Sequence, residues 1–242
     1  MKLLKLSALS ILTVSTLLMS VSSVMAEESE ETTATITFRP NEGPVTPPDP
    51  EIPGPGEPGP EGPVTPPPVP GPFGIWVPVL DFGINDVSSE NDYSALALQL
   101  PLADGSQETA PRAHYLAVND SRGTNEGWTL SVILEGDGFV DNDTDDILEG
   151  AELRFTGASA YSENDSQLGY RNEFKLDAES GRENIFWAQA DNGQFISMLR
   201  WGAVADLVDG RNPNITLNVP TPTVGNYEAT LNWSLTSGPP VE

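Results

Sequence analysis

Residues 73–242 contain short apolar runs that are separated by Gly, Asn, Asp and Pro. Within several runs, apolar and polar positions alternate with a period of two, as they do in β-strands that bury one face. The run that begins at Tyr227 shows this most clearly, because every second residue as far as Leu235 is apolar. The pattern predicts strands at Ile75–Phe82, His114–Val118, Trp128–Leu134, Glu152–Phe155, Ile185–Ala190, Gln194–Leu199, Ile215–Val219 and Tyr227–Thr236.

Two of these predicted strands share a W-x-L spacing, at Trp128 and Leu130 and again at Trp233 and Leu235. Residues two apart in a strand point to the same face, so the spacing alone predicts the core face of an amphipathic strand. Few windows favour a helix; short helical pieces are expected only at Trp201–Val208 and within the 157–184 loop. The chain is therefore predicted to be all-β, with a single β-sandwich or barrel-like domain and long loops.

The first 26 residues have the features of a secretory signal peptide. Lys2 and Lys5 precede an apolar stretch that ends in the small-residue site Val24-Met25-Ala26. This stretch is too short and wrongly flanked for a transmembrane helix. We therefore expect residues 1–26 to be removed, leaving a secreted, extracellular chain with no transmembrane segment.

Two further segments precede the predicted domain. Residues 27–39 begin acidic and end in the alternating run Ala34–Phe38, which we expect to pair with the main domain because an isolated strand is unstable. Residues 40–72 are rich in Pro, Gly and Glu and contain GPVTPP twice, at 43–48 and 62–67. Proline favours the polyproline II conformation, so an extended, semi-rigid spacer is expected here. A ligand for a proline-reading domain is the alternative.

Composition narrows the range of functions. A formal net charge of -25 opposes binding to nucleic acids and to anionic lipid surfaces. Cysteine is absent, so the fold has to be stabilised by its core without disulfides. His114 is the only histidine, which excludes any multi-histidine metal site. Its strand-like run favours a structural role, and we expect neither catalytic residues nor enzymatic activity.

One acidic stretch has the spacing of an EF-hand calcium loop. Its candidate ligands are the side chains of Asp141, Asp143, Asp145 and Glu152 and the carbonyl of Ile147. Calcium prefers six to eight oxygen ligands, so clustered carboxylates of this kind could contribute to a site. However, Asp146 occupies the position where the loop needs glycine, and the flanking runs predict strands instead of helices. A solvated acidic loop without a cofactor is the alternative.

Three of the five tryptophans, Trp76, Trp187 and Trp201, lie outside the W-x-L spacings. Indole rings can stack on sugar faces because they offer flat apolar area with a polar edge. These three residues are therefore candidates for a glycan-stacking platform, with core packing as the alternative. The run Ile185-Phe186-Trp187 breaks strict alternation, so either Phe186 or Trp187 is expected to face outward or to meet a second layer.

Several motifs occur in a distinctive order along the chain. They are Gly71-Pro72-Phe73-Gly74-Ile75, Leu80-Asp81-Phe82-Gly83, Gly127-Trp128-Thr129-Leu130-Ser131, Leu148-Glu149-Gly150-Ala151 and a closing Y-x-x-x-L-x-W-x-L-x-x-x-P that begins at Tyr227. In this order the motifs resemble those of the WxL domain surface proteins of low-GC Gram-positive bacteria, and in particular a small WxL protein. The resemblance covers essentially all of the chain after the predicted signal peptide.

The resemblance implies adhesion to the Gram-positive cell wall. It implies non-covalent binding to peptidoglycan, within a surface complex that includes WxL-type and membrane-anchored partners. The signature, and with it the candidate wall-binding set, falls on Trp128, Leu130, Tyr227, Leu231, Trp233 and Leu235. The pattern leaves open whether these side chains contact the wall or hold the fold.

Two other functions stay open at this point. In the first, the W-x-L strands form the core of a structural interaction module, whose ligand is a membrane-anchored surface protein. In the second, the acidic loop makes the chain a calcium-dependent, lectin-like binder.

Overall fold

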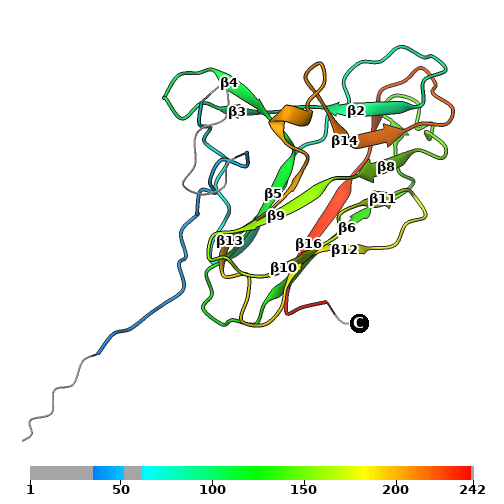
Figure 1. Cartoon of the computed structure of the whole chain (residues 1–242). Helices are drawn as coiled ribbons and strands as arrows, with labels where there is room; N and C mark the ends of the chain where they lie inside the picture. Colours follow the sequence, from blue (N-terminus) through cyan, green and yellow to red (C-terminus); the bar gives the residue numbers. More distant parts are fainter. Residues whose placement is uncertain (1–34, 52–61, 241–242) are drawn as a thin grey trace, which may run out of the picture. The chain divides into compact units, whose positions relative to one another are not determined.

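The computed structural model describes residues 35–51 and 62–240, and Phe38–Glu242 form one compact unit. Within the described residues this unit is almost entirely β, with one 3-10 turn at Val204–Asp206 (Figure 1). Every strand pairing is antiparallel. The prediction of an all-β domain is therefore confirmed.

Three four-stranded sheets make up most of the domain. Sheet A has the order β1 (Phe73–Trp76), β5 (Tyr115–Asp120), β13 (Phe195–Trp201) and β9 (Ala158–Ser162). Sheet B has the order β10 (Leu168–Tyr170), β12 (Glu183–Ala188), β6 (Trp128–Leu134) and β16 (Leu231–Ser237). Sheet C has the order β11 (Phe174–Leu176), β8 (Glu152–Phe155), β14 (Arg211–Asn218) and β2 (Asp92–Leu96). Two short ribbons pair β3 (Leu98–Pro101) with β4 (Thr109–Arg112) and β7 (Val140–Asp141) with β15 (Tyr227–Glu228).

The inner faces of all three sheets meet in one main core. Alternate residues of β6, namely Trp128, Leu130, Val132 and Leu134, supply its centre, as the period-two pattern predicts. Strand β8 adds Leu153 and Phe155 from sheet C, and β13 adds Trp201 from sheet A. The Phe155 ring stacks on Phe174 with their centroids 4.4 Å apart. This core therefore requires strands from distant parts of the sequence to come together.

Strand β5 is buried along its whole length, on both faces. Leu116 and Val118 face the main core, whereas Tyr115 and Ala117 belong to a second cluster on the outer face of sheet A. That outer cluster also contains Val64 and Val69, together with residues of β3, β4 and β13. A strand with both faces apolar needs a layer on each side. Here the second layer comes from the proline-rich segment and the β3–β4 ribbon.

Residues 41–51 and 62–72, hereafter the strap, lie on the domain. Val45 and Val69 exchange two backbone hydrogen bonds, of 2.9 and 2.8 Å, in an antiparallel bridge. The N–H of Thr65 donates to the carbonyl of Pro101 at 2.8 Å, which joins the strap to β3. The two GPVTPP repeats thus place Val45 and Val64 in one apolar cluster.

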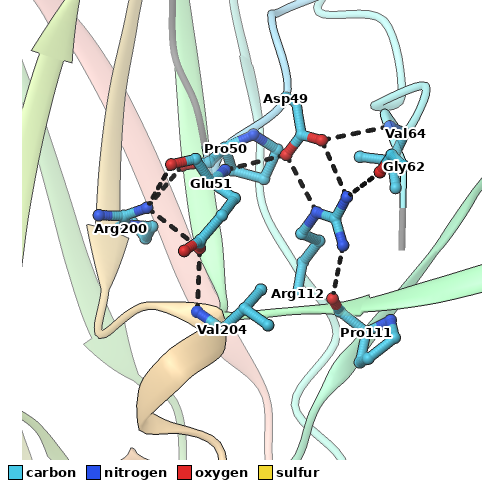
Figure 2. A network of polar contacts seen from close by, with 9 residues as sticks. All are labelled: Asp49, Pro50, Glu51, Gly62, Val64, Pro111, Arg112, Arg200 and Val204. Atoms are coloured by element: carbon cyan, nitrogen blue, oxygen red, sulfur yellow. Dashed lines mark hydrogen bonds and ion pairs between the residues drawn. The ribbon is translucent and has the colours of Figure 1, made fainter. Parts of the chain in front are cut away.

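Two acidic side chains of the strap bind two arginines of the domain (Figure 2). Arg112 Nε and Nη2 donate to the two carboxylate oxygens of Asp49 at 3.0 and 2.9 Å. Glu51 Oε2 lies 3.2 Å from Arg200 Nη1 and accepts the Val204 N–H at 2.9 Å. Only 1% of the Arg112 side chain is exposed, so removing its partner would leave a buried charge uncompensated.

In the described parts of 40–72, apolar valines and paired carboxylates bind the strap to sheet A and to the β3–β4 ribbon, which the expectation of a spacer does not include. Residues 35–38 also differ from the predicted strand: they are assigned no strand, and the side chains of Ile36 and Phe38 are 78% and 83% exposed. The remainder of 27–39, and the predicted signal peptide, lie outside the described residues.

Some observed strand boundaries differ from the predicted ones, because turn residues and tertiary packing also determine where a strand ends. β6 and β8 match their predicted ranges, but the first predicted strand ends at Trp76. The helical expectation at Trp201–Val208 is wrong, because Trp201 belongs to β13 and only a 3-10 turn follows. The loop 157–184 contains β9, β10 and β11 instead of a helical piece. These short strands have too few alternating positions to be recognised by their pattern.

We expect Asp49→Ala to lower the free energy of unfolding by about 3–5 kcal/mol, the usual cost of leaving a buried arginine without its partner. Chemical denaturation followed by tryptophan fluorescence would measure the loss. Glu42→Ala, at an exposed position of the strap, is the matched control. Equal stability of the two variants would show that the ion pair does not hold the strap.

Candidate functional site

The two W-x-L motifs lie on neighbouring strands of sheet B. In the β6–β16 register, Leu130 is opposite Leu235 and Val132 is opposite Trp233. Trp128 is fully buried, its indole N–H donates to the Gly193 carbonyl at 2.9 Å, and its ring meets Phe186 edge-on. The first motif is thus a core element, and neither Trp128 nor Leu130 is accessible to a ligand.

The second motif lies on β16, the edge strand of sheet B. Leu231, Trp233 and Leu235 are half-buried and pack against the main core. An edge strand has one neighbour, so its side chains keep one flank toward solvent. The same spacing therefore produces a buried tryptophan on β6 and an accessible one on β16.

The three other tryptophans do not form one platform, which corrects that expectation. Trp201 is fully buried beside Phe155, with ring centroids 5.1 Å apart. Trp76 is half-buried on the outer face of sheet A, 4.7 Å from the Tyr115 ring. Trp187 is half-buried beside Gly169, where an added Cβ would overlap the indole. Strand alternation and sheet membership place the three rings in different parts of the domain, with Trp201 inside the main core.

The interrupted alternation at Ile185-Phe186-Trp187 has a structural explanation. The β12–β6 register shifts between Asn184 and Phe186, which is a β-bulge at Ile185. The extra residue allows Ile185 and Phe186 both to be buried, while Trp187 lies half-buried opposite Thr129.

The acidic loop uses its first carboxylate to hold the backbone. Asp141 Oδ1 accepts the N–H groups of Asp143 and Thr144, both at 2.9 Å, and Oδ2 accepts the Asn226 N–H at 2.6 Å. The Asp143 bond, followed by the Asn226 bond, lowers the pKa of Asp141 below its ordinary value. Asp141 therefore ties its own loop to the segment that precedes β15.

The predicted calcium ligands are not brought together. Glu152 pairs with Lys175 and, at 2.6 Å, with Arg154, and these two hydrogen bonds lower its pKa. Across residues 35–51 and 62–240, no three Asp, Glu, His or Cys side chains are grouped so as to hold a metal ion. Asp143, Asp145 and Ile147 are exposed. The stretch is built as an Asx-type turn between two short strands, where the flanks of an EF-hand would be helices.

A cleft of ≈ 630 Å³ opens beside this loop. Its walls come from residues 79–87, from the ends of β8 and β14, and from residues 222–231. Its apolar and aromatic lining includes Phe82, Ile84, Tyr93, Phe139, Tyr227 and Leu231. Asp81, Asp86 and Glu228 add carboxylates to the same lining. The volume falls within the range of small-ligand sites.

Hydrogen bonds fix both walls of the cleft. Arg211 Nη1 donates to the carbonyls of Phe82 and Ser94, at 3.0 and 2.7 Å. On the other wall, the hydroxyls of Thr223 and Tyr227 lie 2.6 Å apart. Gly225 approaches both Asp141 and the Tyr227 ring so closely that a Cβ there would overlap them. Asp141 thus supports the wall that carries Tyr227.

Aromatic faces next to carboxylates suit a polyhydroxylated ligand. Rings of the Tyr and Phe type cover the apolar faces of a sugar, and carboxylates accept its hydroxyl protons. Tyr227 and Leu231 belong to the candidate set predicted from the sequence, whereas the wall formed by 79–87 does not. The one available signal was the Leu80-Asp81-Phe82-Gly83 motif, which lines the cleft in full.

His114 lies apart from this chemistry. Its side chain is 1% exposed, and Nδ1 is 3.3 Å from the Asn212 side-chain nitrogen. Burial lowers its pKa from 6.5 to about 4. The expected structural role agrees with this position between sheets A and C.

The domain is all-β and has an aromatic, acidic cleft that could bind a ligand. Comparison with known protein families shows the class of protein: the family described as WxL domain, surface cell wall-binding, matches residues 25–239. The chain belongs to the WxL domain family and is a cell-surface, wall-binding protein. Searches of curated proteins and of solved structures gave no match. In the part of the chain that the structure describes, no helix is long and apolar enough to cross a membrane.

Because His114 takes up a proton more readily in the unfolded chain, the free energy of unfolding should fall by about 3 kcal/mol when the pH is lowered from 6.5 to 4. In this window the unfolded chain binds the proton and the folded chain does not, so stability rises with pH. Urea denaturation across the window would measure the slope, which His114→Gln should flatten. An unchanged slope in the variant would contradict the assignment.

Asp141→Asn should lower the melting temperature at neutral pH, because the amide cannot accept all the hydrogen bonds of the carboxylate. Since the folded pKa of Asp141 is lowered, its contribution is complete above about pH 4 and lost as the pH falls further. Thermal melts with Asp143→Asn, at an exposed position, as the control would test this. The difference between the variants should vanish in strong acid; a difference that persists there would argue against a charge effect.

Proposed function

We propose that the chain attaches to peptidoglycan non-covalently, through the cleft between residues 79–87 and 222–231. In this proposal the secreted protein acts outside the cell, as a component of a surface complex with WxL-type and membrane-anchored partners. The observation that carries the proposal is the meeting of three motifs of the family resemblance in one cleft: Leu80-Asp81-Phe82-Gly83, Leu148, and Tyr227 with Leu231.

Burial explains why the cleft is preferred over the first W-x-L motif. Trp128 and Leu130 are fully buried, so a ligand could reach them only after sheet B opened. In the cleft, by contrast, Ile84 is completely exposed and Phe82, Tyr93 and Tyr227 are half-buried. Partly exposed rings on walls fixed by hydrogen bonds can contact a ligand without a large rearrangement.

Charge supports a glycan surface as the ligand more than an anionic polymer. The cleft lining contains Asp81, Asp86 and Glu228 and no Lys or Arg. Carboxylates repel the phosphates of anionic wall polymers but accept hydrogen bonds from sugar hydroxyls and peptide N–H groups. Peptidoglycan offers both kinds of donor.

Sedimentation with purified peptidoglycan, stripped of anionic polymers, tests the proposal. The chain from Glu27 onward should sediment with the glycan, and Ile84→Asp should weaken binding roughly tenfold, which corresponds to about 1.4 kcal/mol. Ile84 is fully exposed, so the substitution should leave stability unchanged.

Val208→Asp is the matched control, because it adds the same charge at a position that is 60% exposed and outside the cleft lining. If the parent chain remains in the supernatant, peptidoglycan is not the ligand. If both variants bind as the parent does, the ligand binds elsewhere on the domain.

A further inference from the structure

The outer edge of β16 presents an unpaired row of backbone groups. On its inner side β16 pairs with β6, and the flanking bonds run from Glu135 N–H to the Thr230 carbonyl and from Gly238 N–H to the Gly127 carbonyl. Antiparallel ladders alternate, so the even-numbered residues turn their backbone groups toward β6. The N–H and C=O groups of Leu231, Trp233 and Leu235 therefore point away from the sheet.

Within the described residues, β16 is the last strand of sheet B and no further strand pairs with it. Its side chains alternate regularly between an apolar and a polar face along the whole strand. Leu231, Trp233 and Leu235 pack against the main core, and Asn232, Ser234 and Thr236 form the opposite, polar face. An unprotected edge of this kind is a template for another strand.

The half-buried apolar side chains of this edge and of a second edge strand, β1, pack against one core, and we call them together the seam. In sheet A, β1 is also an edge strand, and its residues Phe73 and Ile75 are half-buried against the same core. Arg122 joins the two edges at one end: its guanidinium lies 3.7 Å from the Phe73 ring centroid, and Nη1 donates to Ser237 Oγ at 2.7 Å. An added strand at β16 would cover apolar surface as well as gain hydrogen bonds.

The chain itself contains a segment with the matching pattern. Ala34-Thr35-Ile36-Thr37-Phe38 alternates apolar residues with threonine, as β16 alternates apolar residues with Asn, Ser and Thr. When two strands pair, apolar faces lie on one side of the sheet and polar faces on the other. Ile36 and Phe38 are 78% and 83% exposed, although both are strongly apolar.

We propose that the β16 edge of one copy accepts the Ala34–Phe38 segment of a second copy as an added strand. Main-chain hydrogen bonds to Leu231, Trp233 and Leu235 would supply affinity, and the insertion of Ile36 and Phe38 beside the seam would supply specificity. Because donor segment and acceptor edge are different surfaces, the contact is heterologous and can extend into chains of molecules. The second W-x-L motif, whose Trp233 and Leu235 lie outside the cleft lining, then serves self-assembly.

Sedimentation velocity of the chain from Glu27 onward tests the assembly. Dimers and longer species should appear with rising concentration, and the double substitution Ile36→Asp, Phe38→Asp should abolish them. Both positions are exposed, so folding should not change. The control Val208→Asp, Val224→Asp adds the same charge at positions that are 60% and 92% exposed and should associate as the parent does. A parent that is monomeric at every concentration overturns the proposal.

The absence of cysteine allows a second, positional test. A chain with Thr37→Cys is mixed under oxidising conditions with a chain carrying Ser234→Cys or Thr236→Cys, on the polar face of β16. Disulfide-linked heterodimers should form with at least one of these partners and not with Ser159→Cys, an exposed position on β9. Equal cross-linking to Ser159→Cys overturns the proposal. So does protection of residues 34–38 from hydrogen exchange in the monomer, which would mean that the segment binds its own chain.

Discussion

The structure depends on the burial of β5 on both of its faces. Leu116 and Val118 can enter the main core only if Tyr115 and Ala117 are covered on the other side of sheet A. The strap provides that cover, and the Asp49–Arg112 pair fixes it at a point where the arginine is almost completely enclosed. A segment whose composition suggests a free spacer is thereby part of the fold. The family match, which begins at residue 25, includes this segment as well.

The cleft lies away from the covered strand. The strap closes the outer face of sheet A, whereas the ends of β8 and β14 in sheet C and the loops beside them line an open cleft. The cleft forms there, with one wall tied by Arg211 and the other by Asp141. Asp141 has the charge and spacing of a metal ligand, yet its hydrogen bonds to Asp143, Thr144 and Asn226 make it a structural anchor of that wall.

Much of the fold could be predicted because alternation is a local property. β6 and β8 were located to the residue, and the inward direction of Trp128 and Leu130 followed from their spacing. The cleft could be predicted only in part: Tyr227 and Leu231 were selected through the family resemblance, but their meeting with Phe82 and Tyr93 joins segments more than a hundred residues apart. No local pattern carries that information, and the same holds for the ion pair between Asp49 and Arg112.

The all-β class, the family and the apolar face of each long strand can be read from the sequence, since they follow from composition, motif order and a period of two. The difference between a buried W-x-L motif on β6 and an accessible one on β16 arises from the packing of the sheets, because burial depends on the number of neighbouring strands. The tertiary structure also decided that the proline-rich residues cover a sheet. Polyproline composition limits the conformation of a segment but does not reveal which surface its valines and carboxylates will contact.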